Sequence, residues 1–396
     1  MKRVLTAVLA LAALPATAQS LDDLNLQVHG YVTQGFIYTT QNNVFTMDSS
    51  DGSPAWTEAV VNLTAQPAAK LRVGVQGRYF LMGNIGNAIS LDWAEADYKT
   101  SDKFGVRFGK VKTPVGLFNE IQDIDPAYSF ALLPQSVYDI LSRNTWLTHL
   151  GGVVYGSTKI PNTNQKLEYR LFGGEQVESS NDPNITLGLQ GTGITLPNGW
   201  TGPMWGMALH YKPIPSLMIG ASDTIFVTTW SAVANWNQPS GASIQGSNGT
   251  PPSQNYYYFA KYEKNKVMIA GEYLRNQYVS WFKWPTDPAA NSTSRVDQRS
   301  WYALGNYKLT GKLTLGLYDS QSLDRQQPLA LAGIPNYARY SKDWTLNARY
   351  DFNQYLYAKF DQHLVSGTEL DYDTNLNPHG IKPTTKMTIL KIGVVF

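Results

Sequence analysis

The sequence predicts an all-β fold: a transmembrane antiparallel β-barrel of about sixteen strands, with a long loop after the fifth strand. Three observations favour this fold. Short runs in which apolar and polar residues alternate recur from residue 26 to the last residue. The connections between these runs alternate between tight turns and long polar segments. The polar face of the runs carries many charges, which the interior of a soluble β-sandwich or propeller would have to bury at high cost.

The third run shows the alternation most clearly, with Val73 and Val75 on one face and Arg72 and Arg78 on the other. The fourth run changes phase around Trp93, so the sequence does not assign its two faces. The sixteen predicted strands span residues 26–38, 59–65, 71–81, 89–99, 104–108, 147–156, 167–171, 205–211, 217–227, 256–262, 267–278, 301–307, 313–320, 344–350, 356–360 and 390–396.

The connections divide into two classes by length. Tight turns are expected at residues 66–69, 100–103, 212–215, 263–266, 309–311 and 352–354, and a somewhat longer one at 157–165. Long polar segments lie at residues 175–203, 229–255, 280–297, 321–341 and 367–384. Short periplasmic turns at one end and longer extracellular loops at the other are typical of membrane β-barrels.

The composition is polar but weakly charged. Charged residues make up 16% of the chain, below the ~25% of ordinary globular proteins, while aromatic residues make up 12%. The chain has no cysteine, which excludes disulfides and thiol chemistry. The net charge of +2 gives no support to nucleic-acid binding.

Residues 1–18 have the pattern of a secretory signal peptide. A charged start at Lys2 and Arg3 precedes an apolar stretch, and Ala16-Thr17-Ala18 matches an A-x-A cleavage site. The apolar stretch is shorter than the ~20 residues that a spanning helix needs. The mature chain, residues 19–396, is expected to form the barrel.

The connection after the fifth strand, residues 113–143, is long enough to predict a functional loop. Pro114, Pro126 and Pro134 stiffen it, and residues such as Phe118 and Phe130 give it apolar groups to bury. A loop of this composition needs a cavity, so we expect it to fold into the barrel and form the pore constriction. The residues predicted to line the pore and its constriction are Arg72, Arg78, Arg107, Lys110, Glu120, Asp123, Asp125, Arg143, Arg170 and Arg349.

The charges predicted to face the lumen are balanced in sign. Glu120, Asp123 and Asp125 of the loop are expected to face basic residues of the wall, such as Arg72, Arg78 and Arg107. A balanced wall does not select strongly by charge. Acids and bases on opposite sides would create a transverse field that favours dipolar or charged small solutes.

The sixteen amphipathic strands, the segment GKVKTPVGLFNEIQD with LLPQSVYD downstream, and the terminal Phe396 resemble the outer-membrane porins of Gram-negative bacteria. The resemblance implies a water-filled channel for passive diffusion of small hydrophilic solutes, surrounded by outer-membrane lipid and lipopolysaccharide. It also implies a homotrimer, and a third long loop that narrows the pore. The PEFGG-type loop of general diffusion porins and the dense Lys/Arg ladder of phosphate-selective porins are absent from the sequence.

The alternative is an outer-membrane barrel enzyme or an adhesin without a steady open pore. The sequence has no G-x-S-x-G or H-E-x-x-H motif, and its five histidines are scattered without metal-ligand spacing. We therefore predict that the protein is not an enzyme and has no cofactor. The alternating oxygen ligands of loop 371–377 resemble a calcium loop, but Leu376 and Lys382 stand where an EF-hand needs Gly and Glu. A solvated surface loop is the expected structure there.

Overall fold

The computed structural model describes residues 24–190, 193–234, 242–325, 335–369, 372 and 375–396. The predicted signal peptide, residues 1–18, lies outside this part of the chain. The described chain is almost entirely β-structure, and no described helix is long and apolar enough to cross a membrane.

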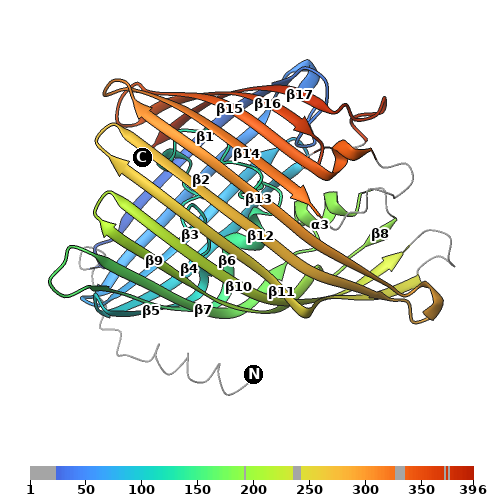
Figure 1. The fold of residues 1–396 in the computed structure, drawn as a ribbon, viewed down its shortest axis with the longest axis horizontal. Coiled ribbons are helices and arrows are strands. Elements are labelled where there is room, and N and C mark those ends of the chain that lie inside the picture. The colour runs from blue at the N-terminus through green and yellow to red at the C-terminus, as the bar shows by residue number, and fades with distance from the viewer. Residues whose placement is uncertain (1–23, 191–192, 235–241, 326–334, 370–371, 373–374) are drawn as a thin grey trace.

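Sixteen antiparallel strands form the wall of a closed barrel (Figure 1). Each strand pairs with its neighbours along the chain, and β1 pairs with β17 to close the ring. The two-residue β8 (Ile194–Thr195) pairs only with the end of β10 and adds no strand to the wall. The wall strands are β1 (Gln27–Thr39), β2 (Ser53–Ala68), β3 (Leu71–Met82), β4 (Ile85–Ser101), β5 (Phe104–Lys112), β6 (Thr148–Lys159), β7 (Lys166–Glu178), β9 (Trp200–Ile214), β10 (Leu217–Ala234), β11 (Ala242–Lys264), β12 (Val267–Lys283), β13 (Ser292–Lys308), β14 (Leu313–Asp324), β15 (Tyr340–Asp351), β16 (Leu356–Gly367) and β17 (Thr384–Val395).

The last residue completes the closure of the barrel. The backbone N–H of Gly30 donates to the Phe396 carbonyl at 2.9 Å, and the Phe396 N–H donates to the Gly30 carbonyl at 3.0 Å. Because β1 and β17 pair along their length, neither strand presents a free edge.

All sixteen predicted runs coincide with wall strands to within one residue at their ends, but several strands are longer than predicted. The hairpins β10–β11 and β12–β13 take up much of residues 229–255 and 280–297, where the sequence predicts loops. The outward residues Thr229 and Ser231 are exposed and polar. The extended hairpin therefore lacks the alternation of hydrophobicity by which a strand is recognised.

The predicted change of phase near Trp93 is a β-bulge. Gln76 pairs with Trp93 and the next residue, Gly77, pairs with Leu91, which leaves Asp92 as the extra residue of β4. Both Asp92 and Trp93 are buried as a result, although neighbouring residues of a regular strand point to opposite faces. The bulge thus turns the Asp92 carboxylate towards the interior.

The two faces of the wall differ as a membrane barrel requires. The outer face exposes large apolar side chains on every wall strand, for example Val61, Trp205, Ile269 and Leu346. The inner face carries polar and charged side chains. Apolar atoms outside and charges inside match a lipid exterior with a hydrated lumen.

Candidate pore and constriction loop

Residues 113–142 connect β5 to the short helix α2 (Arg143–Leu147), which leads into β6. This segment, here called the inner loop, lies inside the ring of strands, where Figure 1 draws it in teal. Its side chains and backbone reach β3 through Gln76, β12 through Glu272 and β16 through Asp361. These strands are far apart around the barrel, so the inner loop crosses the lumen.

A buried ion cluster attaches the inner loop to the last two strands. Asp125 Oδ1 lies 2.5 Å from Lys391 Nζ on β17, and Asp125 Oδ2 lies 3.0 Å from Lys359 Nζ on β16. The Tyr357 hydroxyl donates to the same carboxylate at 2.5 Å. Burial alone would raise the pKa of Asp125, but the two ammonium groups outweigh it and hold that pKa well below its usual range.

A second attachment is the carboxylate of Glu272 on β12, which is 4% exposed. It accepts hydrogen bonds from the hydroxyls of Tyr138 and Tyr302, at 2.6 and 2.8 Å, and from the Leu117 N–H at 3.1 Å. Gly116 precedes this contact with a φ of 61°, and a Cβ there would lie 2.4 Å from Glu272 Oε1. Only glycine fits this turn without strain.

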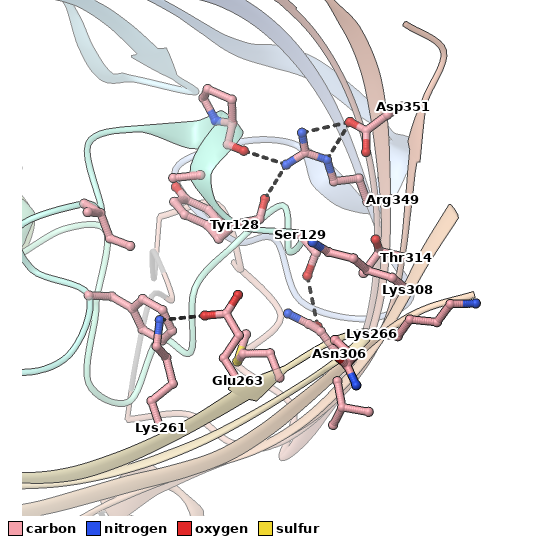
Figure 2. Close-up of a pocket in the computed structure, with 17 residues that line it drawn as sticks. Tyr128, Ser129, Lys261, Glu263, Lys266, Asn306, Lys308, Thr314, Arg349 and Asp351 are labelled. Carbon is pink, nitrogen blue, oxygen red and sulfur yellow. Dashed lines mark hydrogen bonds and ion pairs between the residues drawn. The ribbon is translucent and has the colours of Figure 1, made fainter. Parts of the chain in front are cut away.

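Two side chains of the barrel wall also form hydrogen bonds with backbone groups of the inner loop. Asp361 accepts the N–H groups of Ala131 and Leu132, at 2.7 and 3.2 Å. Arg349 donates to the carbonyls of Pro126 and Tyr128, at 2.7 and 2.9 Å (Figure 2). These contacts satisfy polar backbone groups that would otherwise be costly inside the barrel.

Apolar packing completes the attachment of the inner loop. Three clusters of buried apolar side chains join it to the inner wall. In the third cluster Phe118 and Phe130 pack against Tyr302 and Tyr318, with 4.9 Å between the ring centroids of Phe130 and Tyr318. The inner loop therefore has a hydrophobic core of its own within the lumen.

Four of the ten predicted lining residues are buried and do not face open water. Asp125 is held as described, and Asp123 pairs with Lys112 at 2.7 Å. Arg143 forms a bidentate pair with Asp92, at 2.8 and 3.2 Å. Burial alone would lower the pKa of Arg143, but Asp92 outweighs it and raises that pKa above its usual range.

Arg78 is the fourth buried residue, and it pairs with Glu58 on β2 at 2.5 Å. The expectation that Asp123 and Asp125 face the pore opposite Arg78 is therefore wrong: each charge is paired elsewhere, with side chains that bury it. Unpaired, such charges would be costly in the interior, and each of the four is held by a partner of opposite charge.

The partly exposed charges gather around Glu120. Its carboxylate lies 3.3 Å from Arg107 on β5 and 3.3 Å from Arg170 on β7. About a quarter of the Glu120 side chain is open to solvent (27%). Here an acid of the inner loop contacts two of the predicted basic residues, Arg107 and Arg170, and all three side chains are partly open to solvent.

The remaining predicted residues have other partners. Arg72 is half-exposed and lies 3.3 Å from Glu95. The Lys110 ammonium donates to the Leu91 carbonyl at 2.5 Å. Arg349 pairs with Asp351 at 2.9 Å, in addition to its contacts with the inner loop.

Cavities lie on both sides of the inner loop. Towards the short turns, one cavity of about 490 Å³ includes Arg72, Arg107 and Glu120, and another of about 340 Å³ includes Arg349 and Lys308 (Figure 2). A third cavity, of about 250 Å³, lies towards the long loops. Charged side chains line the first two cavities, whereas amides, hydroxyls and aromatic rings dominate the third.

Sequence reasoning missed the role of two residues that hold the inner loop. Lys391 lies on the inner face of the last strand, where the sequence offers no sign of its partner. The alternation of residues in its strand predicts that Glu272 points inwards. It does not predict its tyrosine partners, because Tyr138 lies in the inner loop and Tyr302 on β13. Among the residues of loop 371–377 that are described, Asn377 bonds to Asn43 at 2.9 Å, and no group of potential metal ligands is found in the described chain.

Solved outer-membrane proteins share this fold. The OmpT protein of Vibrio cholerae lacking loop L8 matches with a TM-score of 0.56 at 10% identity, over 94% of this chain and 99% of that one. The outer-membrane-expressed form of OmpT gives 0.55 at 10% identity, over 96% and 99%. OmpF of Salmonella typhi, in complex with daunomycin, gives 0.54 at 14% identity, over 96% and 99%. No protein-family model and no curated protein matches the chain.

The closed antiparallel barrel and its apolar outer face thus identify the chain as a membrane β-barrel. Its fold is that of the outer-membrane proteins of Gram-negative bacteria.

Proposed function

We propose that this protein is an outer-membrane channel through which small hydrophilic solutes pass by diffusion, with the inner loop as its constriction. The short turns of the barrel would face the periplasm and the long loops would face the outside of the cell, as is usual for outer-membrane barrels. Outer-membrane lipid and lipopolysaccharide surround the barrel. The channel needs no cofactor, and it catalyses no reaction.

The observation that carries this proposal is the course of the inner loop across the lumen, with cavities on both sides. Barrels of sixteen to eighteen strands are wide enough for an aqueous channel, and a loop fixed inside one narrows it. The contact of Glu120 with Arg107 and Arg170 supports the proposal, because it joins opposite charges that are partly open to solvent. Such a pair produces a local field without a strong preference for one sign of ion.

Conductance and solute uptake test the proposal together. In planar bilayers the purified protein should give steady conductance steps, and proteoliposomes should swell in small neutral solutes faster than in larger ones. A barrel enzyme or an adhesin with a closed lumen would give neither result. Absence of both in correctly folded protein would reject the channel.

We also propose that the protein assembles as a homotrimer. One of the solved structures with this fold, OmpT of Vibrio cholerae, is described as a trimer form, with a TM-score of 0.53 at 11% identity. The molecular mass of the detergent-solubilised protein, measured by light scattering with the detergent contribution subtracted, tests this. A mass of three mature chains supports the trimer, and a mass of one mature chain rejects it.

A further inference from the structure

The cavity of about 250 Å³ on the long-loop side of the inner loop differs in chemistry from the other two. It lies between the inner loop, α2 and the inner faces of β7 and β9–β13. Among its described lining residues, Asp139 alone carries a charge at neutral pH. The Asp139 carboxylate already accepts the N–H groups of Leu141 and Ser142, at 2.9 and 3.2 Å. The cavity therefore offers a bound molecule mainly neutral groups.

A row of amide side chains crosses one wall of this cavity. Asn255 on β11 pairs in register with Asn276 on β12, which pairs in register with Gln298 on β13. All three line the cavity, because they occupy inward positions of adjacent strands. Because adjacent strands are only ~4.8 Å apart, one ligand with several hydroxyl groups can contact more than one of these side chains.

Several polar atoms of the lining have no hydrogen-bond partner within the described chain. They include Oδ1 of Asn255, Oδ1 of Asn276, Oγ1 of Thr228 and Nε1 of Trp200. Asn255 and Thr228 are only 1% and 3% exposed, so these are buried groups for which bonding is expected. The set combines amide acceptors, an indole donor and a hydroxyl that can donate or accept. Molecules with several hydroxyl groups complement such a set.

Aromatic side chains supply the rest of the lining. Trp146 of α2 packs edge-to-face on Phe226, with 5.2 Å between ring centroids, and Tyr257 and Tyr278 line the same cavity. Rings of this kind provide flat apolar surfaces that suit the C–H faces of a sugar ring. At ~30 Å³ for each water molecule, the cavity has room for about eight waters, which is comparable to one sugar ring with its hydroxyls.

We propose that this cavity is a binding site for a neutral polyhydroxylated solute, a monosaccharide or one unit of a larger sugar, on the outer side of the constriction. The inference builds on the proposed channel and names a class of solute for it. An anion would meet no opposite charge among the described lining residues, and a cation would meet only Asp139, whose carboxylate already accepts two backbone N–H groups; loss of hydration therefore disfavours both. A sugar would instead satisfy the orphaned amide, hydroxyl and indole groups.

Isothermal titration calorimetry on the folded barrel in detergent tests the site. Glucose should bind saturably, whereas glucuronate and glucosamine, which add a negative or a positive charge to the same ring, should bind at least about tenfold more weakly. Asn276→Ala should weaken glucose binding by about tenfold. The control Gln277→Ala changes the next residue, outside the cavity lining, and should leave binding unchanged.

Trp146→Ala removes an aromatic surface from the loop side of the cavity and gives a second variant if Asn276→Ala fails to fold. Galactose and sucrose should be titrated beside glucose, since the site is inferred for the class. Failure of every neutral sugar to bind, tighter binding of either charged analogue, or equal binding by Asn276→Ala and Gln277→Ala would overturn the proposal. Conductance without sugar binding would reject this binding site but keep the proposed channel. Sugar binding without conductance would keep the binding site but reject the channel.

Discussion

The ammonium group of Lys391 lies 2.5 Å from the carboxylate of Asp125, although 266 residues separate the two in the sequence. Lys391 belongs to β17, the strand that closes the barrel against β1, and Asp125 belongs to the inner loop. Closure of the barrel and placement of the loop are therefore linked through one buried contact. The link implies that the inner loop reaches its final position only when the last strand is in place.

The first prediction concerns this contact. Asp125→Asn removes the negative charge and leaves two buried lysines, Lys359 and Lys391, without an opposite charge between them. Loss of one partner of a buried ion cluster costs about 3–5 kcal/mol. The free energy of unfolding, measured with urea in lipid vesicles, should fall by that amount.

The control for this prediction is Asp102→Asn. Asp102 forms an exposed pair with Lys99 at 2.8 Å in a short turn, and exposed pairs contribute little to stability. Equal unfolding curves for Asp125→Asn and Asp102→Asn would show that the cluster does not hold the loop.

The second prediction concerns the charge beside the water path. Of the three loop acids predicted to face the pore, Glu120 alone is substantially open to solvent. Glu120→Gln removes the acid that Arg107 and Arg170 share, while Arg107 keeps its contact with Asp97 at 3.3 Å, so the local potential becomes more positive. The zero-current potential across a bilayer in a salt gradient should shift towards anion selectivity.

Asp102→Asn serves again as the comparison, because it removes the same charge at an exposed turn where salt screens it within ~8–10 Å. An unchanged zero-current potential in folded Glu120→Gln would place Glu120 away from the ion path.

The third prediction tests which face of the wall meets lipid. Val61 on β2 is 45% exposed on the outer face, and its neighbour Asn62 lines the cavity of about 490 Å³. An arginine on the lipid face near the membrane midplane costs about 2–4 kcal/mol, whereas one in the lumen keeps its water. Val61→Arg should therefore lower the free energy of unfolding in vesicles by this amount, while Asn62→Arg should be tolerated. A larger loss of stability from Asn62→Arg than from Val61→Arg would show that the lipid and lumen faces are assigned the wrong way round.

The fourth prediction is a pH dependence. Glu369 lies beyond the end of β16 and accepts a hydrogen bond from Gln298 at 3.1 Å. Burial raises the pKa of Glu369 to about 7, from an ordinary value of 4.5. Since the folded chain binds this proton more tightly than the unfolded chain, the group stabilises the fold fully below about pH 4.5. This contribution is lost as pH rises to 7, and at most about 3 kcal/mol is involved.

The unfolding temperature, read from the heat-dependent shift in gel mobility, should reflect this titration. Between pH 5 and pH 8 the wild-type protein should lose more stability than Glu369→Gln, which cannot titrate at this position. Identical pH profiles for the two proteins would remove Glu369 as the source of the dependence.

Local pattern in the sequence was enough to predict the barrel, because each wall strand alternates between lipid and lumen, as Val73 and Arg72 do. The inner loop could also be located, since its length and its apolar residues, such as Phe118 and Phe130, require a place to pack. The pairing of Asp125 with Lys391, and of Arg143 with Asp92, could not be predicted. Those contacts join distant segments, and alternation assigns a side chain to a face without giving its partner.

The same limit explains why Asp123 and Asp125 were expected at the pore. A charge on the lumen side faces water only where the inner loop leaves space for water, and that depends on the packing of the whole loop. Glu120 and Asp123 are three residues apart, yet one is partly exposed and the other is buried with Lys112.

Single-channel conductance of the wild-type protein and of a variant with a shortened inner loop tests the central claim most directly. The Leu117 N–H donates to the Tyr138 hydroxyl at 2.8 Å, so residues 119–136 can be replaced by a short Gly-Ser linker that closes the gap. The wild-type protein should conduct in steady steps, and the variant, if its barrel folds and shows the usual heat-dependent mobility shift, should conduct in larger ones. A wild-type protein that does not conduct, or a folded variant with unchanged conductance, would contradict a channel constricted by this loop.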